Sequence, residues 1–109
     1  MTRVKFLSKQ ESLYGFEIKG HSSSDCNDSE GKIVCSAVSS AAYMAANTIT
    51  EIIGDECETV VDDALMRVVV IAPSEFSHKV LDGLKLHLTE LSKQYPLNIK
   101  VIYGGVKNA

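Results

Sequence analysis

Apolar and polar side chains alternate along the first twenty residues. The period of two predicts strands at residues 3–8 and 14–19, joined by a hairpin loop over the polar residues 9–12. The alternate apolar positions are expected to face inward; they are Val4, Phe6, Phe16 and Ile18. Gly20 ends the second strand, which places His21 at its exit.

From residue 33 the apolar spacing changes to steps of three and four, which predicts a helix over residues 33–53 that Gly54 ends. The helix is rich in Ala and Ser, which suits close packing on a sheet. Residues 58–62 and 65–72 predict two further strands. The second of these is almost continuously apolar, so we expect it to be central.

A second helix is predicted from the N-cap Ser74 to about Tyr95. Its apolar stripe consists of Phe76, Val80, Leu84, Leu88, Leu91 and Tyr95. A last alternating strand contains Leu97, Ile99, Val101 and Tyr103. The order ββαββαβ predicts an α+β fold, a mostly antiparallel or mixed five-stranded sheet packed with two helices, in one domain over residues 1–109.

Composition narrows the functional classes. The chain has 109 residues, 45% of them hydrophobic, and a formal net charge of −3. An acidic chain of this kind is not expected to bind nucleic acid directly. No signal peptide is recognisable and no segment is expected to cross a membrane. Three cysteines, an odd number, favour a reducing compartment, so we expect a cytoplasmic protein.

His21 and Cys35 are the candidate catalytic residues, separated by a polar loop over residues 22–32. Cys35 is expected in the first turn of the first helix, where the partial positive charge of the helix N-terminus stabilises a thiolate. His21 would act as the base. Backbone N–H groups at Cys35 and Ser36 are expected to form the oxyanion hole. Ser39, four residues after Cys35, shares its helix face and lines the pocket or bonds to the imidazole.

Other interpretations of these residues exist. A cysteine in a helix of small residues is commonly a packing residue. His21, Asp25, Cys26 and Cys35 carry zinc-ligand side chains, but they lack the closely spaced cysteine pair of structural zinc sites. We therefore expect neither a metal nor a cofactor. Cys26 is also near enough in sequence to form a regulatory disulfide with Cys35.

For three further residues and one acidic stretch we expect no catalytic role. Cys57 is expected to be structural, and His78 and His87 to be solvated. The acidic side chains between residues 56 and 63 are expected to be solvated as well, with weak support for contact with a basic peptide.

The Gly20-His21 pair, the Gly31-to-Cys35 segment with its following Ser-Ala-Val-Ser, and the element order together resemble the ribosomal-processing cysteine protease (Prp) family. The resemblance implies a homodimeric bacterial endopeptidase that removes the N-terminal extension of a large-subunit ribosomal protein. It implies catalytic roles for His21 and Cys35, a supporting role for Ser39, and a loop that closes on the peptide.

The chain departs from the family pattern at two positions. Lys32 stands where the family usually has Asp, and Ser22 where it often has Ala. The residue that orients the histidine is therefore open among Glu30, Asp28 and Asp25, or the pair acts as a dyad. The alternative function is a non-catalytic ribosome-assembly module that binds a basic ribosomal-protein tail.

Overall fold

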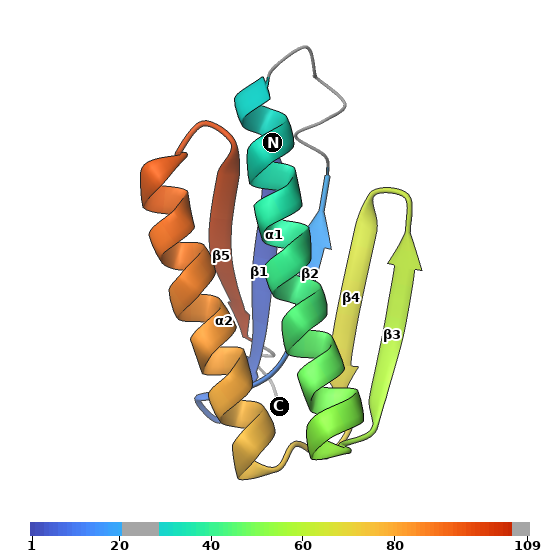
Figure 1. The fold of residues 1–109 in the computed structure, drawn as a ribbon. Coiled ribbons are helices and arrows are strands. Elements are labelled where there is room, and N and C mark those ends of the chain that lie inside the picture. The colour runs from blue at the N-terminus through green and yellow to red at the C-terminus, as the bar shows by residue number, and fades with distance from the viewer. Residues whose placement is uncertain (21–28, 106–109) are drawn as a thin grey trace.

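The computed structural model describes residues 1–20 and 29–105 of the chain. Its elements run in the order β1 (Thr2–Lys9), β2 (Ser12–Lys19), α1 (Ser29–Asn47), η2 (Thr48–Ile53), β3 (Cys57–Asp62), β4 (Leu65–Val70), α2 (Glu75–Gln94) and β5 (Ile99–Gly105). η2 is a π-helical segment that continues α1. The predicted order ββαββαβ is confirmed (Figure 1).

The five strands form one mixed sheet in the order β3-β4-β2-β1-β5. Strand β5 runs parallel to β1, and the other three pairings are antiparallel. β4 is interior, as its apolar sequence requires, but the central strand is β2. Because a buried apolar run is needed at any interior position, the sequence of β4 does not distinguish the centre from its neighbour.

The β1–β2 hairpin is tighter than the sequence suggests. Its turn is only Gln10 and Glu11, and both have positive φ, 53° and 67°. Two successive residues in this region make the type I′ turn that matches the twist of a hairpin. A bulge between Leu7 and Ser8 adjusts the register next to this turn.

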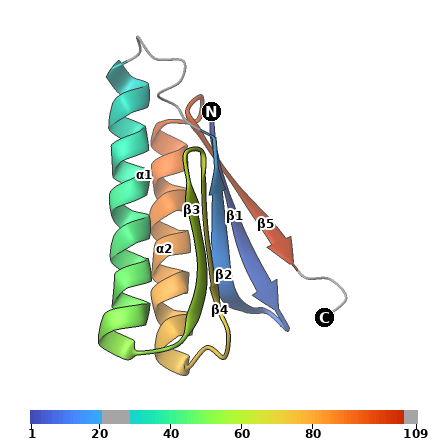
Figure 2. The ribbon, with the colours of Figure 1, turned by 90° about the vertical axis from the view of Figure 1, so that its right-hand side faces the viewer.

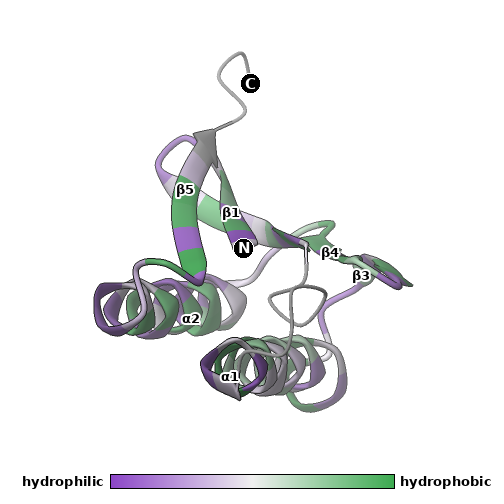
Figure 3. Cartoon of the chain, turned by 90° about the horizontal axis from the view of Figure 1, so that it is seen from above, coloured by the Kyte–Doolittle hydropathy of each residue, from purple (hydrophilic) through white to green (hydrophobic). Residues whose placement is uncertain are grey.

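Both helices lie on the same face of the sheet, so the molecule has two layers (Figures 2 and 3). The core fills the space between the layers, and its fully buried side chains include Val4, Phe6, Phe16, Val34, Val38, Ile49, Val68, Val70, Leu81, Leu88 and Ile99. Phe6 and Phe16 are paired across β1 and β2, and their ring centroids are 6.4 Å apart. The predicted inward face of these two strands is confirmed.

The first helix begins at Ser29, four residues earlier than its apolar pattern predicts. Its end is as expected: Gly54 adopts a left-handed φ of 87°, and its N–H donates to the carbonyl of Ile49. α1 and η2 together span Ser29–Ile53, long and apolar enough by composition to cross a membrane. Their apolar stripe, including Val34, Val38 and Ile49, is buried against the sheet, which accounts for that composition.

A carboxylate anchors the start of α2. Asp55 Oδ2 accepts hydrogen bonds from the Ser77 hydroxyl at 2.6 Å, the Ser74 hydroxyl at 2.7 Å and the Ser74 N–H at 2.9 Å. Ser74 is the N-cap, as predicted, and accepts from the N–H of Ser77. These hydrogen bonds, that from Ser77 foremost, hold the pKa of Asp55 below its usual value of 3.8.

Two predictions about α2 are wrong because this anchor sets the rotation of its first turn. Ser77 is fully buried, so Phe76, expected in the apolar stripe, is 69% exposed. His78, expected to be solvated, is half-buried, and its Nδ1–H donates to the carbonyl of Leu13 at 2.7 Å. Leu97, expected in the last strand, lies in the preceding turn and is exposed.

Asp55→Asn is expected to lower the melting temperature at neutral pH, because an amide replaces the carboxylate that accepts three hydrogen bonds. The folded-state pKa of Asp55 lies below 3.8, so its stabilisation is complete above that pH and disappears as the pH falls through the folded-state pKa. The difference in melting temperature between wild type and variant should therefore close on acidification. Asp82→Asn, an exposed change on α2, is the control. A difference that stays constant with pH would contradict this assignment.

Candidate active site

Cys35 borders a cavity of about 150 Å³ at the end of the sheet where β2 finishes. Three parts of the chain enclose it: one face of α1, the turn between β3 and β4, and the ends of β1 and β2. The lining residues are Thr2, Ile18, Gly20, Cys35, Val38, Ser39, Tyr43, Val61, Asp62, Asp63, Ala64, Leu65 and Met66. The half-buried thiol is thus accessible from a concave surface built by segments distant in sequence.

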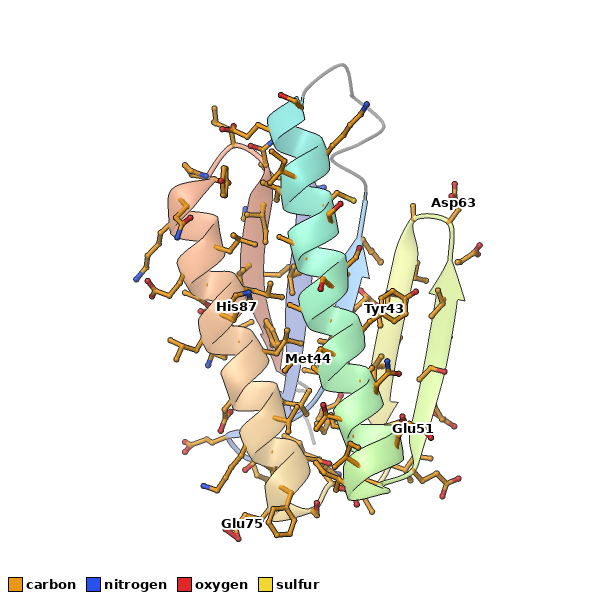
Figure 4. All side chains as sticks on the ribbon, in the orientation of Figure 1. Tyr43, Met44, Glu51, Asp63, Glu75 and His87 are labelled. Carbon is orange, nitrogen blue, oxygen red and sulfur yellow. The ribbon has the colours of Figure 1, made fainter. Side chains whose placement is uncertain are left out.

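The α1 wall carries Cys35, Ser39 and Tyr43, which follow one another at intervals of four. Residues four apart lie on one helix face, so Ser39 borders the same cavity as Cys35, where the spacing predicts it. Its role there stays a prediction. Tyr43 was not predicted, although the same spacing continued for one further turn would have found it. It extends from α1 towards β4 (Figure 4).

The opposite wall is the tip of the β3–β4 hairpin. Asp62 ends β3 and Asp63 follows in the turn, and both line the cavity that contains Cys35. Figure 4 shows Asp63 at this tip. Two carboxylates near a candidate nucleophile favour a substrate with positive charge. Their place could not be read from the sequence, because it depends on how a distant hairpin pairs with β2.

The point where the chain leaves β2 is fixed by Gly20. Its N–H donates to the carbonyl of Ala64 at 3.0 Å, which joins the strand to the β3–β4 turn. Its φ of 87° is left-handed, and a Cβ added there would lie 2.6 Å from the carbonyl oxygen of Met1. Glycine is therefore required at this position, and the next residue in the chain is His21.

The remaining predicted site residues divide into two groups. His21, Ser22, Asp25, Cys26 and Asp28 lie outside the described residues. Glu30 and Ser36 are exposed on α1, and neither belongs to the cavity lining. Lys32 is likewise exposed and away from the lining. Among described residues the structure thus brings Ser39, but not Ser36 or Glu30, to the cavity of Cys35.

The prediction that the N–H groups of Cys35 and Ser36 are free to form an oxyanion hole is wrong. Because α1 begins at Ser29, Cys35 lies in its second turn rather than its first. There the N–H groups of residues 35 and 36 bond to carbonyls four residues earlier in the helix. The free N–H groups of the helix belong to its first turn, on the N-terminal side of the thiol. The helix dipole still favours a thiolate, but over a longer distance.

Cys57 differs from Cys35 in environment. Burial, and secondarily the charge of Asp55, raises the pKa of the Cys57 thiol, and its sulfur lies 3.8 Å from the carbonyl of Asp55. A thiol that resists ionisation is a poor nucleophile, so the structural interpretation of Cys57 agrees with its surroundings.

Within residues 1–20 and 29–105, no group of three His, Cys, Asp or Glu side chains is arranged to hold a metal ion.

Two larger hollows lie elsewhere. One, of about 680 Å³, runs between α1 and α2, and another, of about 620 Å³, adjoins the β1–β2 turn. Neither is bordered by Cys35 or by the two aspartates of the hairpin tip. The smaller cavity is therefore the candidate active site, because a nucleophilic thiol and polar side chains meet there.

Comparison with known proteins shows the family to which the chain belongs. The model of a family described as Cysteine protease Prp matches residues 1–100. No curated protein sequence matches the chain. Among solved structures, the ribosomal processing protease Prp from S. aureus in complex with a substrate peptide superposes with a TM-score of 0.85 at 18% identity, covering 95% of this chain and 100% of that one.

Two further structures show the same fold. S. aureus Prp with a covalently linked product peptide gives a TM-score of 0.81 at 18% identity, over 95% of this chain and 100% of that one. SMU.848 from Streptococcus mutans gives 0.85 at 20% identity, over 96% of this chain and 95% of that one.

Gly20→Ala is expected to reduce both stability and peptide hydrolysis. A left-handed φ costs a residue with a side chain about 1–2 kcal/mol, and the added methyl also displaces the backbone of Met1. Gly54→Ala is the matched control, because Gly54 has the same φ of 87° with nothing within 4 Å of the added Cβ. Both variants should lose stability in urea, and only Gly20→Ala should also lose hydrolysis under conditions where the protein is folded. Equal hydrolysis by both variants would refute a positioning role for Gly20.

Proposed function

Because this chain belongs to the Cysteine protease Prp family, it is a cysteine protease, and we propose that it removes the N-terminal extension of a large-subunit ribosomal protein in the cytoplasm. The observation that supports this most is the cavity shared by Cys35 and Ser39 at the end of β2, which is also lined by Gly20, the residue before His21. The S. aureus relatives, named as ribosomal processing proteases with bound substrate or product peptide, support a peptide substrate.

The proposed chemistry is acyl transfer. The Cys35 thiolate attacks the scissile carbonyl, and His21 accepts the thiol proton and later delivers it to the leaving amine. Water then hydrolyses the thioester and releases the new N-terminus. Ser39 lies one turn along the same face of α1, where its hydroxyl is suited to donate a hydrogen bond to the carbonyl oxygen as it gains charge.

The walls of the cavity suggest how the peptide is held. Tyr43 on α1 and Val61 on β3 offer apolar surface on two walls of the cavity, and both are more than one third exposed. Asp62 and Asp63 supply negative charge beside them. Tails of ribosomal proteins are commonly basic, because they contact RNA. An apolar residue at the cleavage point with basic residues nearby would therefore complement this surface.

Cleavage of the host's extended ribosomal-protein peptide tests the proposal directly. Wild type should make a single cut, detected by mass spectrometry, and Cys35→Ala should make none, because the nucleophile is removed. Cys57→Ala is the control cysteine, and it should cut at the wild-type rate, since its thiol has a raised pKa and lies outside the cavity. An intact peptide that binds wild type and Cys35→Ala equally would favour the assembly-module alternative.

We also propose that the protein acts as a homodimer joined through the hollow between α1 and α2. This hollow is mainly apolar, with Ala41, Met44, Val80 and Leu84 among its lining residues. Met44 is 73% exposed, and Figure 4 shows it with His87 in the space between the two helices. An apolar hollow with a large exposed apolar side chain at its surface is typical of an interface.

Met44→Glu is expected to raise the dimer dissociation constant about tenfold or more, because it would bury an unpaired carboxylate in an apolar contact. Light scattering over a concentration series measures this change. Leu97→Glu is the control, since Leu97 is 84% exposed and lies away from the hollow, in the turn before β5. Equal dissociation of both variants, or a wild type that is monomeric throughout, would contradict the proposed surface.

A further inference from the structure

The face of the sheet opposite the helices is open among the residues that the structure describes (Figures 2 and 3). Side chains alternate between the two faces of a strand, and the inward set of β1 contains Val4 and Phe6. Arg3 and Lys5 therefore project from the open face. Their strand lies between β2 and β5, so the strand register decides which side chains surround them.

The register collects cations from four strands into two adjacent rows. In the first row Lys100 of β5 pairs with Arg3 of β1, and Arg3 pairs with Lys19 of β2. In the second row Lys5 pairs with Glu17, and Glu17 pairs with Arg67 of β4. Neighbouring strands are separated by about 4.8 Å, so three cations of the first row fall within roughly 10 Å across the sheet.

We call the five cations of these rows the basic face: Arg3, Lys5, Lys19, Arg67 and Lys100. Two carboxylates share the rows: Glu17, at 3.5 Å from both Lys19 and Arg67, and Asp62 of β3, which pairs with Leu65 at the far end of the first row. Five cations and two carboxylates leave a formal excess of three positive charges, on a chain whose net charge is −3. The side chains remain accessible, with Lys19 63% and Arg67 48% exposed.

The basic face has no evident role in stability. Like charges opposite one another on neighbouring strands are destabilising, and the first row sets three of them side by side. Within residues 1–20 and 29–105, no ion pair relieves Arg3, Lys5 or Lys100, whereas Glu17 pairs with Lys19 and Arg67. An external anion would remove this repulsion, so the arrangement points to an anionic partner.

We propose that the basic face binds the phosphate backbone of RNA. The two rows contain no aromatic side chain on which bases could stack, which indicates backbone contact without sequence preference. Arg3 and Arg67 match the geometry of phosphate oxygens, and the lysines add charge. The choice of RNA over another polyanion rests on the proposed function, because a ribosomal-protein substrate is found with RNA.

This surface lies at the same end of the sheet as the cavity of Cys35, on the opposite face. The first row contains Lys19, next to the cavity-lining Ile18 and Gly20, and its pairing continues to Leu65, which also borders the cavity. RNA bound to the basic face would therefore hold the protease close to its substrate and leave the cavity open. Net charge predicted no direct nucleic-acid binding, but net charge averages over faces that the fold separates.

Binding of a labelled single-stranded oligoribonucleotide, followed by fluorescence anisotropy over a series of salt concentrations, tests this proposal. Arg3→Gln with Lys100→Gln removes two cations of the basic face. Lys79→Gln with Lys93→Gln removes two exposed cations from α2 and gives the same net charge. For wild type the logarithm of the binding constant should fall linearly with the logarithm of the salt concentration.

The basic-face double variant should lower the magnitude of that slope by about 1.4, which is about 0.7 for each phosphate that is no longer neutralised, and the α2 variant should leave it unchanged. Equal reductions in both variants, or no binding by wild type, would overturn the proposal. Competition by poly-glutamate as effective as that of RNA would overturn the choice of RNA and favour an acidic protein.

Peptide cleavage separates this proposal from the proposed function. Both double variants should cut the free ribosomal-protein peptide at the wild-type rate, because neither changes the cavity lining. Thermal unfolding should show no loss of stability in the basic-face variant, because it relieves repulsion. A wild type that binds RNA and fails to cut the peptide would refute the proposed function alone.

Discussion

The burial of one face of α1 in the core is the constraint on which the rest of this structure depends. The buried face of α1 carries Val34 and Val38 in its first half and Ala42, Ala45 and Ala46 in its second half, and Ile49 continues this face in η2. Once one face of the helix is fixed in this way, the position of Cys35 beside the end of β2 follows, because the helix cannot rotate without exposing Val34 and Val38.

The β3–β4 hairpin completes the site from the other side. The pairing of β4 with β2 extends as far as Lys19 and Leu65. One further backbone hydrogen bond, from the Gly20 N–H to the Ala64 carbonyl, joins the two segments beyond the end of β2. The strand register thus brings Asp62 and Asp63 to the cavity that α1 borders. Backbone hydrogen bonds, rather than contacts among the functional side chains, determine the geometry of this wall.

The sequence was sufficient for the fold and for the place of Ser39 beside Cys35, because both depend on local periodicity. Alternation predicted the faces of β1 and β2, and the four-residue spacing predicted that Ser39 accompanies Cys35. The start of α1 was missed because Gly31 is a poor helix former and the first turn has no apolar spacing, so only tertiary context fixes it. Phe76 and His78 were misassigned because Asp55, nineteen residues before Ser74, sets the rotation of α2.

The same reasoning explains why composition gave an incomplete account of charge. Alternation along β1 sends Val4 and Phe6 to the core and Arg3 and Lys5 to the open face, so one strand supplies both core packing and surface charge. Cross-strand register then concentrates cations that are as far apart in sequence as Arg3 and Lys100. The carboxylates at the hairpin tip, Asp62 and Asp63, border the cavity of Cys35. A chain with a small net charge therefore presents a positive region on the open face of the sheet and a negative region at the tip of the β3–β4 hairpin, and each region can meet a different partner at the same end of the molecule.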